Sequence, residues 1–167
     1  DRGHRYILNL REGEQYTRHY SSLGKTSAFY VPNQGKDPES ANERYRIRGN
    51  GVRLFRPPLT REGMVRALHD SANLRALVPA GGFAPARAGE PAVAVFKVEG
   101  ANVITSLKIF AWFHRKTSTD VNRIEISTCN GLSWREVWDG ARADTPQPVV
   151  SLGDEVSGAY EGLVRVT

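Results

Sequence analysis

The sequence predicts an all-β fold, an antiparallel β-sandwich of jelly-roll type with irregular loops and at most one short helix. Apolar runs of strand length, alternating or continuous, recur along the chain and are strongest after residue 91. The segments between them hold no helix long enough for the crossovers that join parallel strands. The chain also has 16 glycines and 9 prolines, enough for many turns.

The N-terminal third is expected to contribute strands over residues 6–10, 15–20 and 51–56, where Tyr, Thr, Ile and Val alternate with polar residues. Residues 31–50 are rich in Pro, Asn, Gly and charge, which predicts an exposed loop. In the segment 59–89, Thr60 is a candidate cap for a short helix. That helix would carry on one face Met64, Val65 and Leu68. The Pro and Gly residues after Ala72 predict irregular chain.

The C-terminal half has the clearest strand pattern. A nearly continuous apolar run at 92–98 is typical of a strand inside a sheet. Further strands are expected over residues 103–114, 123–128, 133–138, 149–152 and 160–166. Asn130-Gly131 lies between two alternating runs, which predicts a hairpin with a tight turn because both residues tolerate positive φ.

The length of 167 residues fits a single sandwich domain, residues 1–167. The chain begins at Asp1 without a methionine, which we interpret as a mature form or a fragment excised from a larger protein. No apolar run reaches the length of a membrane span, and no signal peptide is recognisable. Cys129 is the single cysteine, so no intrachain disulfide forms; we expect it to be a packed, unreactive thiol.

The net charge of +5 comes from 23 Lys and Arg against 18 Asp and Glu. The basic residues are dispersed and interleaved with acidic ones, which is typical of a solvated, mildly basic surface. An acidic partner such as an anionic polysaccharide is compatible with this balance. Nucleic acid is disfavoured, because the cations do not form a stripe with aromatic residues.

The hairpin resembles the Asp-box of sialidase-type repeats, Ser-x-Asp-x-Gly-x-Thr-Trp, over residues 127–134. The matching residues are Ser127, Gly131, Ser133 and Trp134, whereas Cys129 stands where the family has Asp. In that family the box is a folding element with its Trp packed under the turn, so the resemblance implies β architecture rather than chemistry. One copy argues against a propeller, which repeats the unit in every blade.

Residues from about 91 to 167 also resemble the C-terminal half of galactose-binding-like sandwiches. The resemblance lies in an apolar strand, a long strand, the hairpin and the final Tyr160-to-Val166 strand. Such domains are common as carbohydrate-binding modules and accessory domains of bacterial polysaccharide-degrading enzymes. The resemblance therefore implies a non-catalytic carbohydrate-binding module in the extracellular space or periplasm, fused to a catalytic domain.

The strand predicted at 103–114 carries the most informative pattern. One face is expected to point inward with Val103, Thr105, Leu107, Ile109, Ala111 and Phe113. The other face carries Ile104, Ser106, Lys108, Phe110, Trp112 and His114. An exposed Trp beside cationic donors suits a sugar ring. If the hairpin pairs alongside, the ligand-binding set is Lys108, Trp112, His114, Arg123 and Trp138. The alternative is that Phe110 and Trp112 are covered by a loop or by the 59–89 segment, or lie in a two-sided core.

No catalytic set is recognisable, and no cofactor is expected apart from a structural calcium ion. The four histidines, His4, His19, His69 and His114, lack the spacing of a zinc site. Oxygen donors for calcium are available at Asp70, Asn73, Asp120 and Glu161, although no spacing selects them. Two other functions stay open. One is a polysaccharide lyase or hydrolase with its site in the 31–50 and 59–89 loops. The other is a structural or protein-interaction domain.

Overall fold

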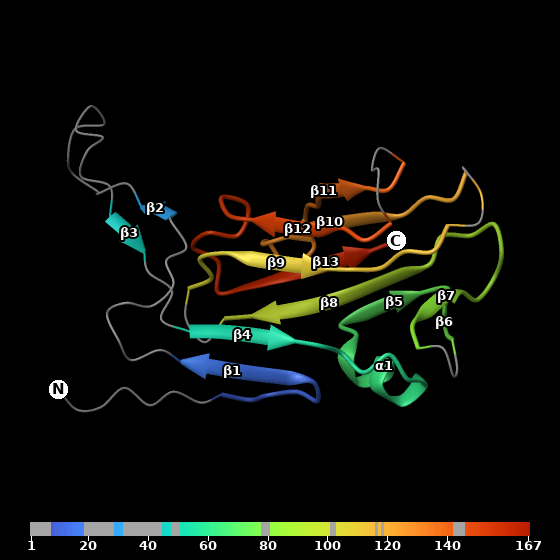
Figure 1. Ribbon diagram of the computed structural model, residues 1–167, viewed down its shortest axis with the longest axis horizontal. Coiled ribbons are helices and arrows are strands. Elements are labelled where there is room, and N and C mark those ends of the chain that lie inside the picture. The colour runs from blue at the N-terminus through green and yellow to red at the C-terminus, as the bar shows by residue number, and fades with distance from the viewer. Residues whose placement is uncertain are drawn as a thin grey trace.

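A computed structural model describes residues 8–18, 29–31, 45–47, 51–77, 81–100, 103–115, 117, 119–141 and 146–167 (Figure 1). Antiparallel strands dominate it, with one short helix, so the predicted all-β class is confirmed. The jelly-roll topology stays a prediction. The helix is too short to cross a membrane, and no other helix in the described part of the chain has the length and apolar character for that.

The main sheet has five antiparallel strands in the order β11-β10-β13-β8-β5. They are β5 (Asp70–Ala72), β8 (Val93–Glu99), β10 (Arg123–Ser127), β11 (Arg135–Asp139) and β13 (Glu161–Val166). β8 and β13 lie in its interior, which explains the apolar run in β8 that the sequence placed inside a sheet.

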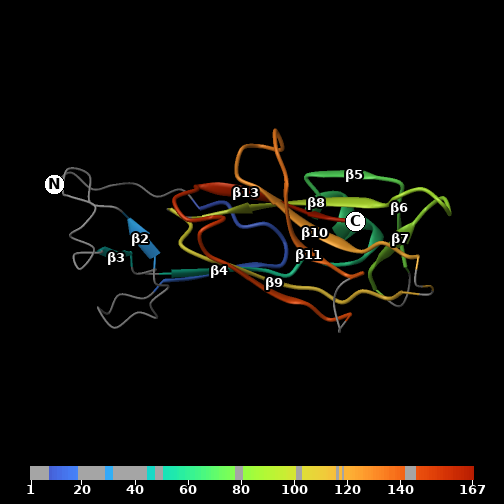
Figure 2. The same ribbon diagram turned by 90° about the horizontal axis from the view of Figure 1, so that it is seen from above.

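A second layer faces one side of this sheet. It contains β9 (Leu107–Phe110) paired with β12 (Val149–Leu152), and β1 (Glu14–Arg18) paired with β4 (Gly51–Phe55). Seen from above, β4 and β9 lie on one side of β8 and β13 (Figure 2). The edge of the Phe55 ring on β4 meets the Phe96 ring on β8, with centroids 6.4 Å apart. This two-layer arrangement is that of a sandwich.

The core lies between the layers and is built by strand alternation. Its buried members are Ile124, Ile126, Val150, Leu152, Val156 and Val164. The inward side chains of β9 and its continuation, from Leu107 to Phe113, pack against them. The predicted inward face is thus confirmed from Leu107 onward. Ile104 also packs against the core, so its predicted outward position is wrong; the alternation starts only where β9 begins.

The helix α1 (Arg61–Ala67) begins where the sequence predicts it. Thr60 Oγ1 accepts a hydrogen bond from the Gly63 N–H at 3.0 Å, as an N-cap does. The predicted apolar face is partly wrong. Met64 and Ala67 are buried, but Val65 is 79% exposed, because Gly63 rather than Val65 packs closely against Pro58.

Two predicted loops contain short strands. In the segment predicted as irregular chain, β6 (Leu74–Ala76) pairs antiparallel with β7 (Phe83–Pro85). Near the N-terminus, β2 (Phe29–Val31) pairs with β3 (Tyr45–Ile47), and most of the predicted 31–50 loop lies outside the described residues. Residues 8–10 are described without a strand, and the rest of the strand predicted at 6–10 lies outside the description.

Candidate functional site

The outward surface of β9 and β12 is a solvent-exposed side of the second layer. We call it the β9–β12 face and define it by the outward side chains Lys108, Phe110, Trp112, His114, Val149 and Ser151. Phe110 pairs with Val149 and Lys108 with Ser151 across the two strands. Beyond the end of β9 the ladder continues, because the Phe113 N–H donates to the Pro146 carbonyl at 2.8 Å. That bond keeps the chain extended, so Trp112 and His114 follow Phe110 on one side.

Large apolar side chains gather on the β9–β12 face and are open to solvent. Trp112 is 77% exposed, Phe110 70% and Val149 61%. The alternative in which the two aromatic rings are covered or lie in a core is therefore wrong. Single exposed hydrophobic residues are ordinary, whereas neighbouring aromatic and aliphatic side chains on a rigid sheet mark a binding surface.

Two of the five residues predicted to bind ligand lie elsewhere. The hairpin of β10 and β11 pairs with β13 in the main sheet, not with β9. Trp138 sits opposite Ile124 and points inward, where it stacks on Phe113 with ring centroids 4.8 Å apart. Arg123 is on the outer surface of the main sheet and forms an ion pair with Glu136 at 3.2 Å. The structure brings together only Lys108, Trp112 and His114 of the predicted set.

Three further members of the β9–β12 face were missing from that set, namely Phe110, Val149 and Ser151. Phe110 shares the alternation of Trp112, so the sequence pattern was sufficient to include it. Val149 reaches the face only through its register opposite Phe110. No sequence signal fixes that register, because β9 and β12 are separated by the whole hairpin.

The turn at Asn130-Gly131 is confirmed. Asn130 and Gly131 have φ values of 55° and 81°, and the Leu132 N–H donates to the Cys129 carbonyl at 3.2 Å. Ser127 Oγ accepts hydrogen bonds from the N–H groups of Gly131 and Cys129 at 2.9 and 3.3 Å. Trp134 lies beneath Gly131, as the resemblance implied, and the Arg165 guanidinium covers its ring at 4.1 Å. Trp134 is therefore a folding element rather than an open platform.

Cys129 is exposed, so the expectation of a packed thiol is wrong. The Ser133 hydroxyl lies 3.1 Å from Cys129 Sγ, and the Ser133 N–H donates to the sulfur at 3.3 Å. Hydrogen bonds from Ser133 and Ser127 stabilise the thiolate and lower the pKa of Cys129 from 9.0 to about 7. The turn brings these donors to the sulfur, although nothing cationic adjoins it in sequence.

We expect iodoacetamide to alkylate Cys129 in the folded protein with a rate that rises through a midpoint near pH 7. Replacing Ser133 by Ala removes the largest contribution and should move that midpoint toward 9. The urea-unfolded protein is the control, because its thiol has lost the turn. Equal midpoints for folded and unfolded protein would contradict the assignment.

A buried ion cluster joins β1 and β4 to the main sheet. The Glu14 side chain is 1% exposed and accepts hydrogen bonds from Arg11 Nη2 at 2.6 Å and Arg53 Nη2 at 2.9 Å. The two arginines also donate to the carbonyls of Lys97 and Glu99 on β8, at 2.7 and 3.0 Å. Burial alone would raise the pKa of Glu14, but the hydrogen bonds outweigh burial and lower it to about 2. Both Glu14 oxygens have partners within the protein, whereas Arg11 Nε and Arg53 Nε are buried without a hydrogen-bond partner among the described residues. The cluster is therefore a structural connection between β1, β4 and the main sheet.

The oxygen donors proposed for calcium are not gathered by the fold. Glu161 pairs with Lys97 at 2.7 Å, and Asp120 accepts hydrogen bonds from the N–H and hydroxyl of Thr117. Asn73 clamps the loop after β7 through bonds to the backbone of Arg87 and Glu90. Within the described ranges, no three His, Cys, Asp or Glu side chains lie close enough to hold a metal ion.

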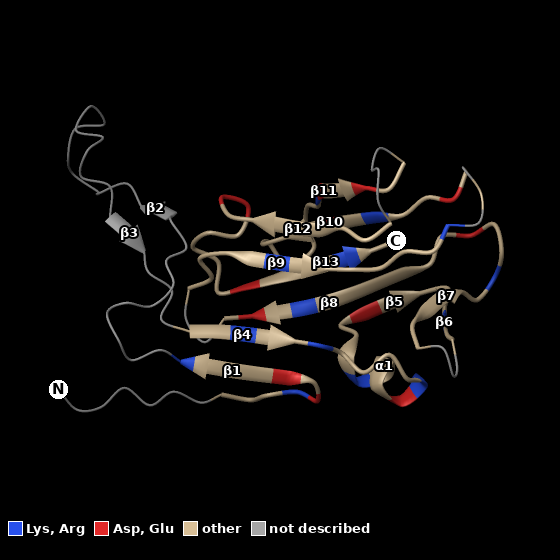
Figure 3. Cartoon of the chain, viewed as in Figure 1, with Lys and Arg blue, Asp and Glu red and all other residues tan. Residues whose placement is uncertain are grey.

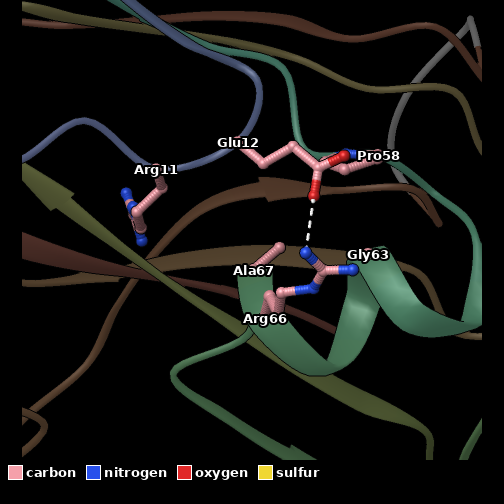
Figure 4. Close-up of a pocket in the computed structure, with 6 residues that line it drawn as sticks. All are labelled: Arg11, Glu12, Pro58, Gly63, Arg66 and Ala67. Atoms are coloured by element: carbon pink, nitrogen blue, oxygen red, sulfur yellow. Dashed lines mark ion pairs between the residues drawn. The ribbon is translucent and has the colours of Figure 1, made fainter.

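A hollow of about 230 Å³ lies between α1 and the turn that precedes β1 (Figure 4). Its lining residues are Arg11, Glu12, Pro58, Gly63, Arg66 and Ala67. Glu12 and Arg66 pair across it at 3.4 Å, and Arg11 is engaged with Glu14. The hollow borders the predicted 59–89 enzyme region through Gly63, Arg66 and Ala67, and its charged groups neutralise one another. It offers no pair of opposed carboxylates for sugar chemistry.

The chain matches no protein-family model, and it has no significant match among curated proteins or solved structures.

Proposed function

We propose that this protein is a non-catalytic carbohydrate-binding module that serves a secreted polysaccharide-processing protein. The ligand binds on the β9–β12 face. The observation that carries the proposal is the exposure of Trp112 and Phe110 on one side of a strand, between Lys108 and His114.

The chemistry of the face suits a sugar. Carbohydrate rings present C–H groups on one side, which pack on an aromatic face, and hydroxyls at the edge, which need donors and acceptors. Trp112 and Phe110 supply the aromatic surface, while Lys108, His114 and Ser151 supply polar groups around it. Because strand backbone holds the side chains, the surface is ordered before the ligand arrives, which lowers the entropic cost of binding.

A second candidate function is a protein-interaction surface. Val149 beside Phe110 adds an exposed aliphatic side chain, and an apolar patch of this kind also suits a protein partner. An oligosaccharide titration distinguishes the two functions, because a carbohydrate-binding module should bind oligosaccharides saturably in the absence of any other protein.

We expect Trp112→Ala to weaken oligosaccharide binding by at least tenfold, about 1.4 kcal/mol, while the melting temperature changes little. The wild-type protein should show partial quenching of tryptophan fluorescence on a saturating oligosaccharide. Tyr160→Ala is the matched control, since Tyr160 is 69% exposed but belongs to the loop before β13. Loss of folding in Trp112→Ala, or unchanged binding, would contradict the proposal.

A further inference from the structure

We infer that the ligand of the β9–β12 face is an acidic oligosaccharide, carrying carboxylate or sulfate groups, that lies along β9. This inference rests on the proposed function and adds the charge and the direction of the ligand. It is carried by the contrast between the two outer surfaces of the sandwich and by the order of side chains along β9.

The outer surface of the main sheet is balanced in charge. Arg165 makes a two-pronged contact with Glu125 at 2.6 and 2.7 Å. Arg123 pairs with Glu136 at 3.2 Å. Lys97 pairs with Glu161 at 2.7 Å and with Glu99 at 3.3 Å, which raises the pKa of Lys97 through the hydrogen bond from its ammonium to Glu161. Each of these cations has its carboxylate within the sheet, as is usual for cross-strand pairs.

The β9–β12 face is built differently. Lys108 is the one charged residue within β9 and β12 (Figure 3). None of the outward positions of the face carries a carboxylate. Neither the Lys108 ammonium nor the His114 ring has a hydrogen bond or ion pair with another residue that the structure describes. Among the described residues, the Lys108 ammonium therefore has no counter-charge, which makes it available to an acidic ligand.

The side chains are also ordered along the strand. Lys108, Phe110, Trp112 and His114 alternate with inward residues, so neighbours on the face are about 6.8 Å apart and the row is ~20 Å long. The aromatic rings occupy the middle of the row and the polar groups occupy its ends. A ligand that uses all four positions is extended and runs parallel to β9, with rings on Phe110 and Trp112 and an acidic group at Lys108.

The test compares a charged probe with its neutral counterpart. Oligogalacturonates of increasing length and their methyl esters are each titrated into the protein, and binding is followed by calorimetry. A sulfated oligosaccharide is titrated as a second acidic probe. We expect a charged probe to bind more tightly than the neutral ester, to weaken as salt rises, and to gain affinity until its length matches the row. Lys108→Ala should weaken binding of the charged probe about threefold to tenfold and leave that of the ester unchanged.

Arg61→Ala is the matched control, because it removes an exposed positive charge from α1, away from the β9–β12 face. It should change the affinity neither for the charged probe nor for the ester. Equal affinity for ester and acid, with sensitivity to Trp112→Ala but not to Lys108→Ala, would overturn the acidic ligand and leave the carbohydrate function standing. No binding of any oligosaccharide, or binding of an acidic protein alone, would overturn both.

Discussion

Replacement of Glu14 by Gln is expected to lower the free energy of unfolding by ~3–5 kcal/mol at pH 7, the larger part of the stability of a marginal domain. The side chain is 1% exposed and lies between two guanidinium groups. Gln keeps the shape but removes the charge, so the neighbouring Arg11 and Arg53 lose the buried carboxylate between them, and among the described residues Arg53 keeps only the longer ion pair with Glu99 at 3.6 Å. The Arg11 guanidinium keeps its hydrogen bond to the Lys97 carbonyl and its contact with the Phe55 ring, neither of which supplies a negative charge.

The loss of stability caused by Glu14→Gln should depend on pH in a defined direction. The folded-state pKa of Glu14 is about 2, below the ordinary value of 4.5, so the folded state favours the ionised form. The stabilisation is complete above about 4.5 and is lost as the pH falls toward 2. This difference in pKa corresponds to about 3 kcal/mol. Urea denaturation should give a difference in the free energy of unfolding between wild type and Glu14→Gln that is constant from pH 7 to 5 and becomes smaller below pH 5.

Glu12→Gln is the matched control for this experiment. Glu12 is two residues away in sequence, is exposed, and makes an ion pair with the exposed Arg66 at 3.4 Å. Exposed pairs contribute little, so its replacement should cost less than about 1 kcal/mol. Equal effects of the two substitutions, or a Glu14→Gln gap that persists unchanged at pH 3, would show that the cluster does not stabilise the fold.

The sequence predicted local features well because each is fixed by neighbouring residues. Thr60 capped α1, Asn130-Gly131 formed the turn, and alternation separated Phe110 and Trp112 from the core-facing side of β9. These outcomes follow from side-chain period and backbone preference within a few residues.

What the sequence did not predict depends on which strands become neighbours. The hairpin pairs with β13, and this choice alone moves Arg123 to the opposite surface and Trp138 into the core. Glu14 was missed for the same reason, because a carboxylate in an alternating strand is expected to face solvent. It becomes buried only when Arg53, 39 residues later, arrives with β4. The lowered pKa of Cys129 likewise depends on the fold of the turn, which brings Ser133 to the sulfur.

The inward position of Trp138 predicts the second large effect on stability, that of Trp138→Ala. Its ring stacks on Phe113 with an interplanar angle of 10° and lies close to Gly140, where a Cβ would come within 2.7 Å of Trp138 Cη2. It thus links β11 of the main sheet to the continuation of β9 in the second layer. Trp138→Ala removes this contact and leaves a cavity between the layers, so we expect the free energy of unfolding to fall by ~3 kcal/mol.

Trp112→Ala serves as the matched control, because it removes the same side chain one residue before Phe113 but from the exposed surface. Its cost to stability should be less than about 1 kcal/mol. If Trp138 instead belonged to the ligand surface, Trp138→Ala would leave the urea midpoint unchanged and abolish oligosaccharide binding. The opposite result, a large loss of stability with residual binding by the fraction still folded, is expected because only Trp112 is open to the ligand. The two tryptophans therefore separate the two surfaces of β9 and its continuation: the inner surface holds the layers together, and the outer surface is where we propose that the ligand binds.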